Sequence, residues 1–241
     1  MIGPGSLDEL ARLVRRPASV GRLLVGRRSP ALGASILGAV AVARPDEPWP
    51  TYRGEPMVGL AQLNVADAPA VPDALRDIAL LTVFIGLDGE ALEIPDGRAN
   101  GDGWLVRSYP GLDDLAAIND PPAPAWLRRR LLAWDRIEDL PALEDLLDIV
   151  DGEALDRLLD GGDFGTAVGS PASGTKLGGW PDLIQGEIAW HSQPAAGSPE
   201  FCLQIDSDER LGLNLWDGGA IYLGRQTAGG SAGWIASAQF M

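Results

Sequence analysis

The chain has 241 residues, 46% of them hydrophobic, and can therefore bury the core of one large domain or two small ones. Its 34 acidic and 19 basic side chains give a formal charge of −15 at pH 7. We expect no binding of free nucleic acid, because polyphosphate binding needs clustered lysine and arginine. The single cysteine, Cys202, excludes an internal disulfide and a cysteine-cluster metal site, and it fits a reducing compartment.

Residues 1–30 are the basic part of the chain, with six arginines against two acidic residues. Ser6 and Glu9 have the spacing of a capping box, which predicts a helix from Leu7 to Arg16. A second short helix is expected over 20–26. We therefore predict that residues 1–30 form a basic helical arm on an otherwise acidic body.

Arg27 and Arg28 precede an apolar run at 31–43, an arrangement that imitates a twin-arginine export signal. The run is shorter than the roughly 20 residues that a membrane span needs. It also overlaps the first copy of an internal repeat, so that cleavage would remove structure. We expect a folded arm, no membrane span and a cytoplasmic location.

Two segments near the ends of the chain share the order and spacing of their motifs, which indicates an internal repeat. Each contains a Leu-Gly pair, a tryptophan, a segment around a glutamine and an apolar stretch. The first copy consists of Leu37-Gly38, Trp49, Gln62 and 80–85, and the second of Leu177-Gly178, Trp190, Gln204 and 220–223. Polar and apolar residues alternate around both glutamines, which predicts strands with one buried face.

Between the copies, residues 113–164 are predicted to form an acidic helical insert. Helices are expected at 125–134, 141–150 and 153–160, where leucines recur at helical spacing. Acidic residues outnumber basic ones by nine over 135–163. These carboxylates are interpreted as a solvated outer face, with a docking surface for a basic partner as the alternative.

Together these elements predict an α+β fold. Two related, mainly antiparallel β lobes from an internal duplication are expected at 31–112 and 165–241. With the insert at 113–164 they form a single domain at 31–241, preceded by the arm at 1–30. A last strand is expected over 234–240.

Several motifs resemble those of the YwqG-like proteins, a bacterial family of unknown function. They lie at 176–187, 203–209 and 212–222, and more weakly at Trp49-Pro50 and 60–64. At 216–219 the chain reads Trp-Asp-Gly-Gly, one residue shorter than the usual sequence of that family. The resemblance implies an α+β fold with tandem related β units, and it brings no established catalytic residues.

A cleft between the two lobes is expected to bind a ligand, because tryptophans and polar side chains of both copies would line it. The candidate ligand-binding residues are Gln62, Asn64, Trp180, Gln204, Asp206, Asp208, Glu209, Trp216 and Asp217. The carboxylates at 206–217 lack the pattern of a calcium loop. We expect them to cap turns or to pair with Arg210 and Arg225, and we predict no metal and no cofactor.

No catalytic residue is assigned. His191 is the only histidine and is expected in an exposed loop, and Cys202 is expected to fill a buried strand position. The stretch 169–176 approaches a P-loop, but the Leu-Gly-Gly-Trp-Pro that follows cannot open a helix.

We interpret the chain as a non-enzymatic binding or protein-interaction module, with an immunity or regulatory role, whose acidic surface docks a basic protein partner. The alternative is a small-ligand binder or hydrolase that uses the cleft, with Asp206, Asp208 or Glu209 as base or cation ligand. A purely structural role as half of an oligomer also stays open.

Overall fold

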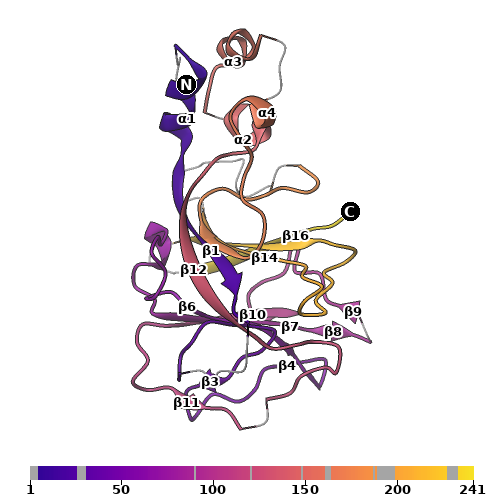
Figure 1. Ribbon diagram of the computed structural model, residues 1–241. Coiled ribbons are helices and arrows are strands. Elements are labelled where there is room, and N and C mark those ends of the chain that lie inside the picture. The colour runs from indigo at the N-terminus through magenta and orange to yellow at the C-terminus, as the bar shows by residue number, and fades with distance from the viewer. Residues whose placement is uncertain are drawn as a thin grey trace.

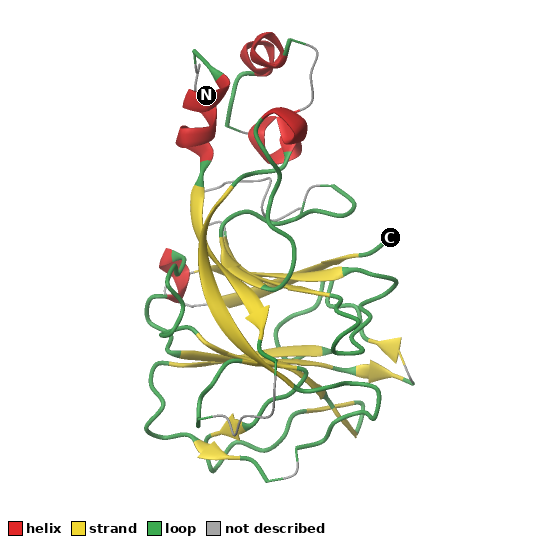
Figure 2. Ribbon diagram, viewed as in Figure 1, coloured by secondary structure: helices red, strands yellow, loops and turns green. Residues whose placement is uncertain are grey.

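The protein is mostly β, with one large antiparallel sheet and a small group of helices at one end (Figures 1 and 2). The computed structural model describes residues 5–25, 31–89, 91–119, 121–147, 149–160, 164–186, 188, 199–226 and 233–241. Among these residues, no helix combines the length and the apolar character that crossing a membrane requires.

The large sheet has ten strands in the order β10-β7-β6-β2-β12-β1-β13-β14-β15-β16. From one edge to the centre these are β10 (Trp104–Tyr109), β7 (Leu80–Ile85), β6 (Val58–Asn64), β2 (Ile36–Leu37) and β12 (Arg130–Asp139). From the centre to the other edge they are β1 (Arg16–Leu23), β13 (Lys176–Gly178), β14 (Glu200–Asp206), β15 (Ala220–Gln226) and β16 (Gly233–Gln239).

Short elements complete the structure. Three ribbons pair β3 (Val42–Ala43) with β11 (Ala116–Ala117), β4 (Thr51–Tyr52) with β5 (Glu55–Pro56), and β8 (Leu87–Asp88) with β9 (Ala91–Leu92). The 3-10 turn η1 (Asp73–Leu75) lies between β6 and β7. The helices are α1 (Leu7–Val14), α2 (Leu143–Leu147), α3 (Gly152–Leu159) and α4 (Phe164–Ala167).

The two halves of the sheet have the same strand order but exchange their first strands. The first half comprises β1, β2, β6, β7 and β10, and the second β12 to β16. The second to fifth strands of each half lie side by side, whereas β1 pairs with β13 of the second half and β12 pairs with β2 of the first. The long strands β1 and β12 also pair with each other (Figure 1). The two halves are therefore interlocked at the centre of one sheet.

The repeated segments of the sequence occupy matching positions in the two halves. Gln62 on β6 lies opposite Thr82, and Gln204 on β14 lies opposite Tyr222. Both strands have a register shift just before the glutamine, between Gly59 and Ala61 in β6 and between Phe201 and Leu203 in β14. Since a bulge changes which side chains face the core, this shared irregularity gives both glutamines the same orientation.

Glycine is required at the second position of both Leu-Gly pairs. Gly38 and Gly178 both have left-handed backbone, with φ of 75° and 68°. A Cβ at Gly38 would lie 2.5 Å from the Arg128 carbonyl oxygen, and one at Gly178 would lie 3.3 Å from the Pro17 carbonyl oxygen. These positions adjoin the exchanged strands, so glycine permits a close approach of the backbones there.

One apolar core fills the space between the two halves of the sheet. It joins side chains of β6 and β7 to those of β14 and β15, among them Leu63, Val83, Leu203 and Leu223. The indole N–H of Trp234 on β16 donates to the Ser108 hydroxyl on β10 at 3.0 Å, which brings the two edge strands together. The sheet is therefore nearly closed around its core.

The predicted α+β fold, with a helical arm, a helical insert and two separate lobes, is wrong. Residues 16–23 of the arm form the central strand β1 in place of the helix expected at 20–26, and the helix expected at 125–134 is replaced by the start of β12. Both strands pair on two sides. Pairing of this kind outweighs local helix propensity, which amounts to less than about 1 kcal/mol per residue.

Other local predictions are confirmed. The strand over 80–85 is β7, the last strand is β16, and the helix predicted over 153–160 is α3. At the start of α1 the hydroxyl of Ser6 accepts the Glu9 backbone N–H, and the Glu9 carboxylate accepts the N–H of Gly5. These elements depend on local patterns that the tertiary structure leaves unchanged.

Candidate functional site

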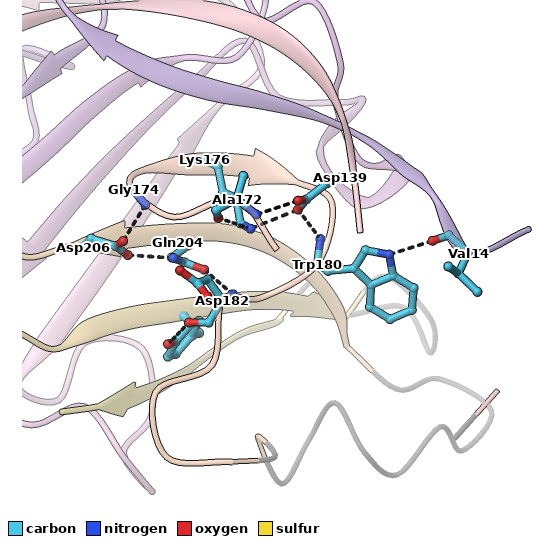
Figure 3. Close-up of polar contacts among 10 residues, drawn as sticks. Val14, Asp139, Ala172, Gly174, Lys176, Trp180, Asp182, Gln204 and Asp206 are labelled. Carbon is cyan, nitrogen blue, oxygen red and sulfur yellow. Dashed lines mark hydrogen bonds and ion pairs between the residues drawn. The ribbon is translucent and has the colours of Figure 1, made fainter. Parts of the chain in front are cut away.

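A buried lysine lies at the centre of a polar network on the outer side of the second half-sheet (Figure 3). Lys176 on β13 is the only lysine of the chain, and its side chain is 0% exposed. Its Nζ donates to the Asp139 carboxylate at 3.0 Å and to the Ala172 carbonyl at 2.5 Å. The ion pair thus joins the end of β12 to β13 and to the loop that precedes β13.

Asp139 holds this loop in place through further contacts. Its carboxylate accepts the backbone N–H of Ala172 at 2.8 Å and that of Trp180 at 2.9 Å. The Trp180 indole N–H donates to the Val14 carbonyl at 2.8 Å, and the Arg16 guanidinium lies 3.3 Å from the centre of the Trp180 ring. Residues 172–180 are therefore fixed to the junction between α1 and β1.

Gln204 and Asp206 extend the network along β14. The Gln204 amide oxygen accepts the Asp182 backbone N–H at 2.8 Å, and its amide N–H donates to the Asp206 carboxylate at 2.7 Å. Asp206 also accepts the Gly174 N–H at 2.6 Å. The Tyr222 hydroxyl donates to the Asp182 carbonyl at 2.6 Å. The outer face of β14 is thus covered by the loops on both sides of β13.

Burial shifts the pKa values of the charged groups in this network. Burial lowers the pKa of Lys176, although the charge of Asp139 opposes the shift. Burial raises the pKa of Asp182 and that of Asp206, with the charge of Lys176 acting in the opposite direction. Since the Lys176 amine is fully buried and donates to protein groups, it offers no accessible nucleophile. The network is a support for the loops around it.

The first half-sheet has a matching but simpler arrangement at Gln62. This side chain is 0% exposed, its amide oxygen accepts the Ala41 N–H at 2.9 Å, and its amide N–H donates to the Ala34 carbonyl at 2.8 Å. The amide oxygen of Asn64 accepts the Asp67 N–H at 3.2 Å. Both side chains bind the chain's own backbone.

The loop after β14 encloses a surface hollow of about 630 Å³, here named the acidic hollow. Its lining residues are Ser207, Asp208, Glu209, Gly212, Leu213, Asn214, Asp217, Gly218 and Met241. The Ser207 hydroxyl donates to the Gly219 carbonyl at 2.8 Å and accepts the Leu215 N–H at 2.9 Å. Because Ser207 follows Asp206 directly, the Lys176 network also positions the start of this loop.

Two of the three carboxylates in the acidic hollow are exposed and make no ion pair within the described part of the chain; these are Glu209 and Asp217. The third, Asp208, pairs with Arg210 at 2.6 Å. Burial raises the pKa of Asp208, but hydrogen bonds from Arg210 outweigh burial and leave that pKa below its usual value. With Arg210 counted, the hollow carries two net negative charges.

The predicted ligand-binding residues fall into separate places. The Lys176 network includes Trp180, Gln204 and Asp206. The acidic hollow is lined by Asp208, Glu209 and Asp217. The first half-sheet carries Gln62 and Asn64 on β6. Trp216 is half-buried, and its indole N–H donates to the Leu92 carbonyl at 2.8 Å. The apolar core separates the two half-sheets, so these residues do not share a cleft between lobes.

Sequence reasoning missed the residues at the centre of the network: Lys176, Asp139 and Asp182. The isolated lysine within a glycine-rich apolar stretch was a usable signal, because a lysine there needs a buried partner. No sequence signal pointed to Asp139, which lies in a different strand. As expected, Cys202 is buried, and burial raises the pKa of its thiol.

No group of three or more His, Cys, Asp or Glu side chains suited to a metal occurs in the described ranges. Residues 169–175 lead into strand β13 and not into a helix, as expected from the sequence after the P-loop-like stretch. His191 and Trp190 lie outside the described residues.

Comparison with known proteins gives a family. The family model "Domain of unknown function (DUF1963)" matches residues 35–224, from just before β2 into β15. No curated protein matched the chain. The matched region contains the Lys176 network and the loop of the acidic hollow.

Proposed function

We propose that this chain, which belongs to the DUF1963 family of unknown function, is a non-enzymatic interaction module. Its acidic hollow receives a lysine or arginine side chain of a basic protein partner. The formal charge of −15 supports this proposal, because it attracts a basic partner over long range and raises the association rate.

The observation that carries the proposal is the pair of exposed carboxylates, Glu209 and Asp217, in a hollow that also has apolar surface. Met241 is 81% exposed beside them, and Leu213 contributes to the lining. A lysine or arginine side chain has an aliphatic stem that favours such apolar surface and a cationic head that favours the carboxylates. The hollow therefore matches both parts of a basic side chain.

The lining of the acidic hollow favours a basic side chain over a small apolar ligand. Its volume of about 630 Å³ lies within the range of roughly 300–1,000 Å³ that is typical of small-molecule pockets, so the lining and not the size indicates the ligand class. Small-molecule sites are mostly apolar, whereas charged and amide side chains contribute much of this lining. A basic segment of a partner would satisfy these groups.

An enzymatic function has less support from the geometry. Two nucleophilic groups of the described residues, the Lys176 amine and the Cys202 thiol, are both 0% exposed. The space between the half-sheets, where a hydrolase cleft was expected, contains the apolar core. A binding role needs neither group.

Fluorescence anisotropy with a labelled oligo-arginine peptide tests the proposal. We expect binding at low salt and its loss at about 0.5 M salt, where the screening length is only about 4 Å. The variant Glu209→Gln/Asp217→Asn should lose most of this binding. The control Asp46→Asn/Glu55→Gln removes two exposed carboxylates elsewhere and should bind as the parent does. Equal loss in both variants would show a general charge effect and contradict the role of the hollow.

Three finer assignments belong to the same proposal. The motifs at 203–209 and 212–222, which form the acidic hollow, support a place among the bacterial YwqG-like proteins. The single buried thiol of Cys202 supports a cytoplasmic location, which cell fractionation tests. An immunity or regulatory role follows if a basic partner loses its own activity when it binds.

A further inference from the structure

Three consecutive arginines lie on a segment that contacts the loop of the acidic hollow. Arg128 and Arg129 precede β12, and Arg130 is its first residue. All three are exposed, and none forms an ion pair with a carboxylate in the described part of the chain. We name these three residues the basic strip. Although the chain has a formal charge of −15, it leaves these positive charges available to an acidic group of another molecule.

Two backbone contacts place this segment against the loop of the acidic hollow. The backbone N–H of Arg128 donates to the Leu211 carbonyl at 2.7 Å. Gly212, which lines the hollow, has a left-handed φ of 67°, and a Cβ there would lie 2.3 Å from the Trp126 carbonyl oxygen. Glycine at this position therefore permits a close approach of the two backbones. The segment of the basic strip and the loop of the acidic hollow are in direct contact.

The same segment exposes a tryptophan. Trp126 is 40% exposed, and its indole N–H donates to no other residue that the structure describes. Tryptophan and arginine are the residue types most enriched among those that dominate the energy of protein interfaces. The segment therefore has the composition of a contact surface for a protein partner.

The unpaired charges of the two contacting segments restrict the chemistry of that partner. Glu209 and Asp217 in the acidic hollow and the basic strip beside its loop have opposite signs, and they form no ion pairs within the described residues. A partner with only basic side chains would be repelled by the basic strip, because like charges at an interface are unfavourable. A partner that carries acidic residues next to its basic side chain would satisfy both groups.

We propose that the basic strip and Trp126 form the second half of the partner-binding surface and bind an acidic segment of the partner. This inference rests on the proposed function, in which a basic side chain of the same partner enters the acidic hollow. The partner is therefore a protein with neighbouring basic and acidic residues and not a simple polycation. The basic strip selects between the two, because it attracts the first and repels the second.

Fluorescence anisotropy of the full chain with two labelled peptides tests the inference. One is oligo-arginine, and the other is a mixed-charge peptide in which a Gly-Ser linker joins a block of arginines to a block of glutamates. At about 0.15 M salt the screening length is roughly 8 Å, so that contacts near the peptide decide its affinity. In Arg128→Gln/Arg129→Gln/Arg130→Gln we expect the mixed-charge peptide to bind about tenfold more weakly and oligo-arginine to bind equally or more tightly. The control Arg12→Gln/Arg15→Gln/Arg157→Gln removes three exposed arginines elsewhere and should bind the mixed-charge peptide as the parent does.

The variant Trp126→Ala tests the aromatic part of the surface. It leaves the Trp126 carbonyl beside Gly212 in place, and we expect it to weaken binding of the mixed-charge peptide by about tenfold. Circular dichroism checks that each variant keeps its fold. A parent that binds oligo-arginine but not the mixed-charge peptide, or a mixed-charge peptide that binds the basic-strip variant as tightly as the parent, would overturn this inference alone. A parent that does not bind oligo-arginine would contradict the proposed function itself.

Discussion

Gln62 and Gln204 make the same kind of hydrogen bond to a loop at matching positions of the two half-sheets. Each is fully buried, and each amide oxygen accepts a backbone N–H from the loop that follows the short second strand of its half. The donor is Ala41 for Gln62, at 2.9 Å, and Asp182 for Gln204, at 2.8 Å. Because a buried N–H without a partner is costly, each glutamine holds one loop against the outer face of the sheet.

Replacing either glutamine should therefore destabilise the fold by a similar amount. In Gln62→Met and in Gln204→Met we expect the free energy of unfolding to fall by about 1–3 kcal/mol, since buried polar groups lose their partner. Urea denaturation followed by tryptophan fluorescence measures this change. Gln226→Met, at an exposed position of β15, is the control and should change stability by less than about 0.5 kcal/mol. A loss confined to one of the two glutamines would contradict their equivalence.

The ion pair of Lys176 and Asp139 should matter far more than the exposed pair of Arg210 and Asp208. Lys176→Met leaves a buried carboxylate without its cation, and we expect a loss of about 3–5 kcal/mol. Arg210→Met breaks a pair in which the Arg210 side chain is 71% exposed, and it should cost less than about 1 kcal/mol. Thermal and urea unfolding of both variants give the comparison. Equal losses of stability in the two variants would show that the ion pair of Lys176 and Asp139 is not buried in the folded protein.

Asp182 should make the protein less stable at neutral pH than at mildly acidic pH. Burial raises the pKa of Asp182 in the folded state. At pH values between the ordinary pKa and the raised pKa, the folded state therefore binds more protons than the unfolded state. The contribution of Asp182 to stability is therefore greatest below the ordinary pKa and is lost as the pH rises through the raised value.

The variant Asp182→Asn isolates this contribution. It should be more stable than the parent at pH 7, and the difference should shrink as the pH falls below about 4. Unfolding free energies of both proteins across this range provide the measurement. Asp77 and Asp135 cannot mimic the effect, because hydrogen bonds from Arg225 and Arg22 lower their pKa values and give the opposite slope. A difference that is constant with pH would refute the assignment.

The exchange of β1 and β12 predicts that the halves stay together after the backbone is cut between them. Residues 121–124 form a proline-rich loop before β12, suitable for an inserted protease site. After cleavage we expect the two fragments to co-elute in gel filtration under native conditions, because separation requires breaking β1 from β13 and β12 from β2. They should separate in denaturant. Separation without denaturant would contradict the interlocked arrangement.

The sequence by itself determined the elements whose signal is local. The apolar stretch at 80–85 predicted the strand β7, and the last strand, expected over 234–240, is β16 (Gly233–Gln239). The start of α1 followed from the cap formed by Ser6 and Glu9. Gln62 and Gln204, around which the sequence spacing is similar, lie on β6 and β14, and each strand has a register shift before its glutamine.

Only the tertiary structure decided the roles of β1, β12 and Lys176. The sequence of β12 favours a helix locally, and it becomes a strand because β1 and β2 supply backbone partners that lie far away along the chain. Lys176 is stable at 0% exposure because Asp139, Ala172 and the surrounding backbone are brought to its amine. Such contacts join residues that are far apart in the sequence, and no local pattern of residue types specifies which distant segments will meet.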